Sequence, residues 1–145
     1  MEIPLATRIF RKVLTTTCEV TLLGDLNGIP PAPDPPSPVP EVQSGPGGLA
    51  VSTRCPDSGK VELEVWAGDP GQVPDGWVQI FDGRLETGVG GFDLGTSTAT
   101  VFHINAPAGN HRVRADALRD DQKPWFASVR FVFAESPDLH GETLY

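Results

Sequence analysis

The sequence predicts an all-β fold, an antiparallel β-sandwich or jelly-roll-like arrangement of about eight strands. Three observations support this prediction. Short apolar runs recur at spacings of roughly 10 residues, with turn-forming residues between them. The 16 glycines and 15 prolines among 145 residues favour short elements over long helices. A hydrophobic fraction of 39% is enough for a buried core, so we expect one domain over residues 1–145.

The clearest strand signals lie between Ser97 and Ala134. Segments 97–104 and 111–118 flank a turn-like segment, and 125–134 follows a charged stretch, which predicts a hairpin with a third strand behind it. Side chains alternate along a strand, so one face should lie in the core and the other in water. The expected core residues are Val113, Ala115, Ala117, Ala127, Val129, Phe131 and Phe133. The expected outer residues are Arg112, Arg114, Asp116, Ser128, Arg130 and Val132.

Earlier segments also have strand character. Segment 12–23 is rich in β-branched residues and predicts one strand. Segments 49–55 and 60–66 predict two strands joined by a turn, the second with Val61, Leu63 and Val65 inward and Glu62, Glu64 and Trp66 outward. Segment 77–81 predicts a short strand stopped by Asp82-Gly83, with 84–87 continuing as a hairpin. Glycines then break the chain before Phe92 and Leu94 start the last set of strands.

Two segments predict irregular structure. Segment 28–48 carries eight prolines, which cannot donate backbone hydrogen bonds, so we expect a loop there and neither a helix nor a central strand. Its PxxP pieces at 33–36 and 35–38 could form a polyproline II ligand, and the alternatives are a plain spacer or an ordered loop that crosses the sheet edge. Residues 136–145 are expected to form a loose tail.

Charge and composition limit the cellular compartment and the classes of partner that we expect. The formal net charge of -8 disfavours binding to nucleic acid and is compatible with simple solubility or with a cationic partner. No apolar stretch has the length of a signal peptide or a membrane span, so we expect a cytoplasmic protein without membrane contact. In that compartment reduced thiols are expected for Cys18 and Cys55, with a disulfide as the alternative. The oligomeric state stays open.

No catalytic constellation emerges, and no cofactor is implied. Gly88 to Gly91 lacks the spacing of a phosphate-binding loop. His103 and His111 flank the turn at 105–110 and could hold a metal together with Asp93 or Asp116. Alternation instead places both histidines on the expected core face, where loop carbonyls would satisfy them.

Surface candidates are more numerous. Arg112, Arg114 and Arg130 could form a basic stripe on an acidic protein, or pair with Asp116, Glu62 and Glu64 on neighbouring strands. The candidate interface residues are these three arginines together with Trp66, Trp77, Glu62, Glu64, Asp120 and Asp121. Trp66 is expected to be an exposed aromatic on a polar face.

Several stretches resemble a group of small, mainly actinobacterial β-sandwich proteins with a competence-protein ComJ-like pattern. The resemblance covers roughly residues 47–135 and is carried by 48–53, 59–65, Trp77 and 107–114. The last stretch resembles the family's PxGxYRVRV hairpin, with His111 in place of the usual tyrosine, and Ala117 to Asp121 replaces its ARGRD. The resemblance implies a β-sandwich, and for a named relative it implies inhibition of a nuclease by protein-protein binding.

These observations lead to a first hypothesis of an intracellular, non-catalytic protein-binding β-sandwich, an inhibitor or immunity-type factor for a basic partner. The alternative is a carbohydrate- or small-ligand-binding jelly roll that uses Trp66, Trp77 or Trp125 as a stacking platform. A hydrolase or metal enzyme near His103 and His111 is a third hypothesis.

Overall fold

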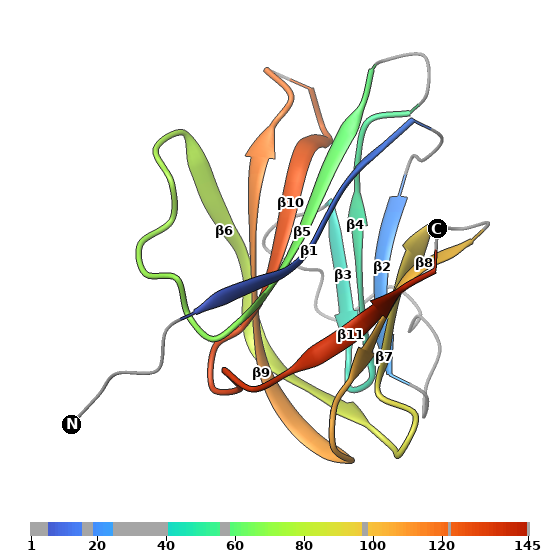
Figure 1. Ribbon diagram of the computed structural model, residues 1–145. Helices are drawn as coiled ribbons and strands as arrows, with labels where there is room; N and C mark the ends of the chain where they lie inside the picture. The colour runs from blue at the N-terminus through green and yellow to red at the C-terminus, as the bar shows by residue number, and fades with distance from the viewer. Residues whose placement is uncertain are drawn as a thin grey trace.

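The computed structural model describes residues 6–15, 19–24, 41–55, 59–96, 99–121 and 123–144. Within these residues the chain forms eleven β-strands in two sheets that pack face to face (Figure 1). The predicted all-β sandwich is confirmed, with more strands than the eight or so expected. No helix among the described residues is long and apolar enough to cross a membrane.

The five-stranded sheet has the order β1-β5-β10-β9-β6. Its strands are β1 (Thr7–Leu14), β5 (Val61–Ala67), β10 (Phe126–Phe133), β9 (Gly109–Arg119) and β6 (Trp77–Thr87). All neighbours pair antiparallel except β5 and β10, which run parallel with Ser128 opposite Glu62 and Phe133 opposite Ala67. This parallel pair joins segments that are far apart in the chain.

The six-stranded sheet has the order β11-β8-β7-β2-β4-β3, and all its pairs are antiparallel. Its strands are β11 (His140–Thr143), β8 (Thr100–Asn105), β7 (Phe92–Thr96), β2 (Glu19–Gly24), β4 (Gly48–Ser52) and β3 (Val42–Gly45). The short strands β3 and β11 form its two edges.

The core lies between the sheets and is rich in phenylalanine. Phe10 stacks on Phe102 with ring centroids 4.4 Å apart, and Phe92 meets Phe133 at 5.5 Å. The inward side chains of β5, β9 and β10 contribute as alternation predicts, with no exposed surface for Val61, Leu63, Val65, Val113, Ala115, Ala117, Val129, Phe131 and Phe133. Each fully buried Val, Leu or Phe stabilises the fold by about 1.5–3 kcal/mol, so this core is the main source of stability.

A bulge at Ala127 modifies the expected pattern. Phe126 pairs with Arg119 and Ser128 pairs with Leu118, which leaves Ala127 as an extra residue in β10. Phe126 therefore also belongs to the core, with no exposed surface.

The predicted hairpin of 97–104 with 111–118 is wrong. β8 lies in the six-stranded sheet and β9 in the five-stranded sheet, so the chain crosses between the layers at Ala106 and Pro107. Likewise, segments 49–55 and 60–66 form β4 and β5, which lie in different sheets. Alternation fixes the buried face of a strand but not its partner, because both sheets present the same apolar side to one core.

Two predicted strand boundaries also change. Segment 12–23 forms two strands, with β1 in one sheet and β2 in the other. Conversely, Asp82-Gly83 makes no turn, and 77–87 is one continuous strand β6 paired with β9. The Phe81 ring packs over Gly83, where an added Cβ would lie 2.9 Å from Phe81 Cζ. Gly83 therefore makes room for an aromatic side chain within the strand.

Both segments expected to be irregular contain edge strands. Within 28–48, Val42 to Gly45 form β3, which pairs with β4 through the turn at Pro46-Gly47. The PxxP pieces at 33–38 lie outside the described residues. The predicted loose tail is wrong for residues 140–143, which form β11 and pair with β8.

The expectation of reduced thiols is also wrong. Cys55 is disulfide-bonded. Cys18, the other cysteine of the chain, lies outside the described residues.

Candidate functional site

The outer face of the five-stranded sheet carries most of the candidate residues. Directly opposite residues point to the same side of a sheet, so the registers define rows that cross all five strands. One row holds Arg8, Trp66, Val132, Arg114 and Asp82. The next row holds Arg11, Glu64, Arg130, Asp116 and Gln79. The third row holds Val13, Glu62, Ser128, Leu118 and Trp77.

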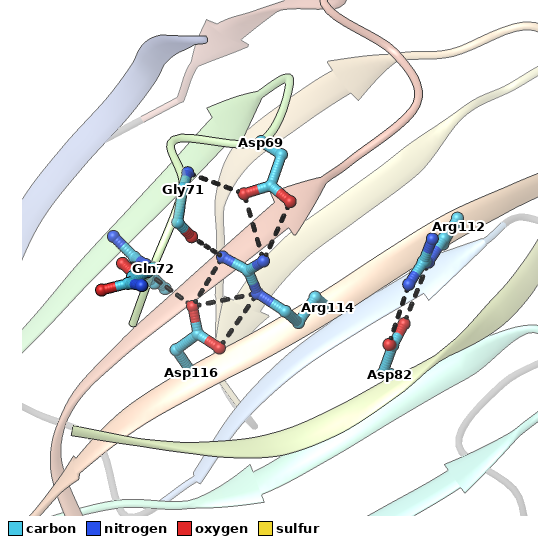
Figure 2. Close-up of polar contacts among 8 residues, drawn as sticks. Asp69, Gly71, Gln72, Asp82, Arg112, Arg114 and Asp116 are labelled. Carbon is cyan, nitrogen blue, oxygen red and sulfur yellow. Dashed lines mark hydrogen bonds and ion pairs between the residues drawn. The ribbon is translucent and has the colours of Figure 1, made fainter. Parts of the chain in front are cut away.

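The centre of this face is not in water, contrary to the expectation for Asp116 and Arg130. The Asp116 side chain is fully buried and accepts hydrogen bonds from Arg130 Nε at 2.8 Å and from Arg114 Nη2 at 3.1 Å. Arg114 Nη1 donates to both Asp69 oxygens at 3.1 Å, so Arg114 lies between two carboxylates (Figure 2). We call Asp69, Arg114, Asp116 and Arg130 the Asp116 cluster.

The loop that joins β5 to β6 explains this burial. β10 and β9 lie between these strands, so residues 68–76 must cross both of them. This crossover loop is held by the arginines, because the Gly71 carbonyl accepts from Arg114 at 3.4 Å and the Gln72 carbonyl accepts from Arg130 at 3.4 Å. The Asp116 cluster therefore fastens the loop to the sheet.

The remaining arginines of this sheet are paired as well. Arg112 donates two hydrogen bonds to Asp82 at 3.2 and 3.0 Å, and Arg84 pairs with Glu135 at 2.9 Å. The Arg112 hydrogen bond lowers the pKa of Asp82, and Asp82 in turn raises the pKa of Arg112. Glu62 and Glu64 pair with Arg11 and Arg8 on β1. Arg112, Arg114 and Arg130 lie on the same outer face but in different cross-strand rows, and each pairs with a carboxylate, so they do not form an open basic stripe.

Asp120 and Asp121 differ in environment although they are adjacent. Asp120 accepts from Arg54 Nη2 at 2.9 Å and from the Trp125 indole Nε1 at 2.8 Å. These hydrogen bonds lower the pKa of Asp120 to about 2, and the bond from Arg54 makes the largest contribution. Asp121 is exposed and adopts a left-handed backbone with φ of 53°. Asp120 thus fastens the β9–β10 loop to the segment after β4, while Asp121 faces water.

The three tryptophans do not share one platform. Trp66 is partly buried rather than exposed, and its buried Nε1 has no hydrogen-bond partner among the described residues. Trp77 is also half-buried and begins β6, with β10 and β9 between it and the strand of Trp66. Trp125 bonds to Asp120 and lies beneath Lys123, whose Nζ is 5.9 Å from the ring centroid.

His103 and His111 lie in different sheets and have different partners. His103 does not face the core. It lies opposite Asp93 on β7, and its Nδ1 is 2.7 Å from Asp93 Oδ1. The Nε2 of His111 is 2.6 Å from the Pro107 carbonyl, and its ring meets Phe92 edge to face. Among the described residues, no three His, Cys, Asp or Glu side chains gather as a metal site would require.

A cavity of about 320 Å³ opens where β8 ends and where β9 and β11 begin. We call it the end pocket. Its lining comes from both sheets and from the loop between β10 and β11, and consists of Asn105, Pro107, His111, Glu135, Ser136, Pro137, Asp138, Leu139 and His140.

Sequence reasoning identified the arginines and His111 but missed two features. Asp69 was not a candidate, because its contact with Arg114 spans 45 residues and depends on the path of the crossover loop. The end pocket was missed because residues 136–140 were assigned to a tail. The pattern Leu139-His140-Gly141-Glu142 holds only one strongly apolar residue, which is a weak strand signal.

The fold is similar to that of a protein of known structure. No protein-family model and no curated protein matches the chain. A solved structure that is similar is ComJ from Bacillus subtilis, described as the inhibitor of the DNA-degrading activity of NucA. The two share 8% sequence identity with a TM-score of 0.61, over 90% of this chain and 98% of that chain. This likeness supports the predicted ComJ-like resemblance at the level of the fold.

Proposed function

We propose that the protein is a non-catalytic inhibitor that binds a basic protein, with DNA-degrading enzymes as the favoured class of partner. The observation that carries the proposal is the distribution of charge on the folded chain. The chain has 19 carboxylate residues and 11 lysines and arginines. All eight arginines form ion pairs with carboxylates of the same chain, so they add little net positive potential to the surface.

The excess negative charge therefore falls on exposed carboxylates. Outside those ion pairs, the exposed carboxylates of the described residues are Asp75, Glu86, Asp121, Asp138 and Glu142. They lie on the crossover loop, on β6, on the β9–β10 loop, and on or just before β11. An acidic surface of this kind attracts a basic partner at long range and speeds encounter.

The fold supports the choice of partner class. ComJ, which has the same fold, is described as an inhibitor of a DNA-degrading activity. An enzyme that binds DNA must present cations to the phosphate backbone. A protein with exposed carboxylates can occupy that basic surface and compete with DNA.

The proposal is tested by inhibition and by its salt dependence. The purified protein is added to basic DNA-degrading fractions from its source organism, and cleavage of linear DNA is followed at about 50 and about 300 mM salt. The higher salt concentration screens charges over a shorter distance. We expect dose-dependent inhibition that weakens at the higher salt. Absence of inhibition in every fraction, together with no basic protein retained on the immobilised chain, would overturn the proposal.

A variant that lacks exposed charges tests whether long-range electrostatic attraction speeds association, without disturbing the core. The triple variant Asp75→Asn, Glu86→Gln, Asp121→Asn removes three exposed charges outside the core. We expect the association rate at low salt to fall about tenfold. Gln79→Ala, an exposed neutral position on β6, serves as the matched control and should leave the rate unchanged.

A further inference from the structure

We infer that the end pocket receives an arginine side chain of the protein partner. This inference rests on the proposed function, since it names the group by which a basic partner is recognised.

The size of the pocket fits a single side chain. Small-ligand and cofactor sites occupy about 300–1,000 Å³, and the end pocket, at about 320 Å³, is at the lower limit. Pro107, Pro137 and Leu139 supply apolar wall, and Leu139 is only 9% exposed. An arginine carries a three-carbon stem that buries well against apolar surface while its charged head stays near polar groups.

The charge of the lining selects a cation. Glu135 and Asp138 line the pocket, and no lysine or arginine does. Asp138 is exposed and belongs to none of the ion pairs of the described residues. Two carboxylates around one cavity favour a guanidinium, because its planar fork can bond to both at once, whereas a lysine ammonium acts as a point charge.

The pair between Glu135 and Arg84 does not block this role. Both side chains are more than half exposed, at 52% and 55%, and such exposed pairs contribute only about 0–1 kcal/mol. Glu135 can therefore turn to an incoming guanidinium at little cost.

One wall of the pocket is fixed before any ligand arrives. A carbonyl oxygen can only accept, so the 2.6 Å contact with the Pro107 carbonyl places the hydrogen of His111 on Nε2. The His111 ring also meets Phe92 with centroids 5.7 Å apart at 82°. Both contacts hold the His111 ring in one orientation. A preformed wall lowers the entropic cost of binding.

The inference is tested with a small probe. N-acetyl-arginine amide is titrated into the ¹⁵N-labelled protein, with N-acetyl-citrulline amide as the neutral isostere and N-acetyl-lysine amide as the point-charge analogue. We expect saturable shifts of the Ser136 and Asp138 amides and of the His111 and His140 ring signals. Binding should be strongest for the arginine derivative and not saturable for the citrulline derivative. Equal binding of the citrulline derivative, or shifts confined to other regions, would overturn the inference.

Charge-removing variants localise the effect. Asp138→Asn should weaken binding of the arginine derivative about tenfold, the fold-change for one lost charge-assisted hydrogen bond. Glu142→Gln removes an exposed carboxylate of β11 outside the lining and should change nothing. A tenfold loss in both variants would show general electrostatics and contradict the inference. Spectra of the free variants check that the fold is retained.

The two proposals fail in different ways. If the arginine derivative binds but no basic partner is found, the proposed function fails and the pocket chemistry stands. If a partner complex forms with the same affinity for Asp138→Asn and for the unmodified protein, the pocket inference fails and the proposed function stands.

Discussion

Asp116 and Arg130 lie directly opposite each other on β9 and β10, and the arginine Nε donates to the buried carboxylate across 2.8 Å. Arg114 binds the same carboxylate, so one fully buried acid compensates two nearly buried guanidinium groups. Asp69 provides the second negative charge from the crossover loop. Burying charges is costly unless they are paired and hydrogen-bonded, so the cluster is stable only while it is complete.

Replacing Asp116 should therefore be strongly destabilising. Asp116→Ala leaves Arg114 and Arg130 without their shared acceptor, and removing one partner from a buried pair costs about 3–5 kcal/mol. Urea denaturation followed by tryptophan fluorescence measures this loss. The control is Asp82→Ala, which breaks the more exposed pair with Arg112 and should cost less than about 1 kcal/mol. Equal costs for the two variants would contradict the role of the cluster.

The pH dependence of stability should report the Asp120 contact. Its pKa of about 2 in the folded protein is below the ordinary aspartate value of 3.8. A depressed folded pKa gives stability that is complete above the unfolded value and is lost as the pH falls through the folded value. We therefore expect the free energy of unfolding to decline between about pH 4 and pH 2. Asp120→Asn should flatten this decline.

A second variant checks the cause of that decline. Arg54 provides the largest contribution to the depressed pKa of Asp120, and Trp125 the next. Arg54→Gln should flatten the acid side of the stability profile more than Trp125→Phe does. Thermal unfolding at half-unit pH steps measures the profiles, and unchanged slopes in both variants would refute the assignment.

The disulfide at Cys55 should contribute to stability. A disulfide stabilises mainly by restricting the unfolded chain, typically by 2–4 kcal/mol. Cys55→Ser should lower the free energy of unfolding by about that amount, and a reductant should have the same effect on the unmodified protein. The variant itself should not respond to reductant. If reductant leaves the urea midpoint of the unmodified protein unchanged, this prediction is contradicted.

The pairing of β11 with β8 can be tested at Gly141. A Cβ there would lie 2.3 Å from the His103 carbonyl oxygen and 2.5 Å from Phe102 Cζ. Gly141→Ala should overpack this contact, cost about 1–3 kcal/mol, and speed hydrogen exchange at the Leu144 amide, which bonds to Val101. Glu142→Ala, an exposed change on the same strand, is the control. If the Leu144 amide exchanges as slowly in Gly141→Ala as in the unmodified protein, β11 has stayed paired with β8 and the prediction is wrong.

The faces of the strands could be predicted from the sequence because burial follows a local rhythm of two residues. Val61, Leu63, Val65 and the inward residues of β9 are buried as alternation predicts. The same rhythm placed Arg112, Arg114 and Arg130 together on the outer face. It failed for His103, since the register shifts between Leu94 and Gly95 where β7 pairs with β8.

Strand partners and covered surfaces could not be predicted, because they depend on contacts between distant segments. Nothing local distinguishes β8, which joins the six-stranded sheet, from a hairpin partner of β9. The burial of Asp116 requires the crossover loop, and the loop's path follows from the position of β6 beyond β9. The turn chemistry of Asp82-Gly83 was likewise outweighed by pairing along the whole of β6.

The parallel pairing of β5 with β10 sets an order for assembly during synthesis. β5 is complete at Ala67, whereas its neighbour β10 ends at Phe133, so one edge of β5 stays unpaired until residues 126–133 have also left the ribosome. Contacts of such large sequence separation slow folding, and an open strand edge invites pairing with other chains. A nascent chain that stalls before Phe126 is thus expected to be prone to aggregation, and chaperone demand should peak in that interval.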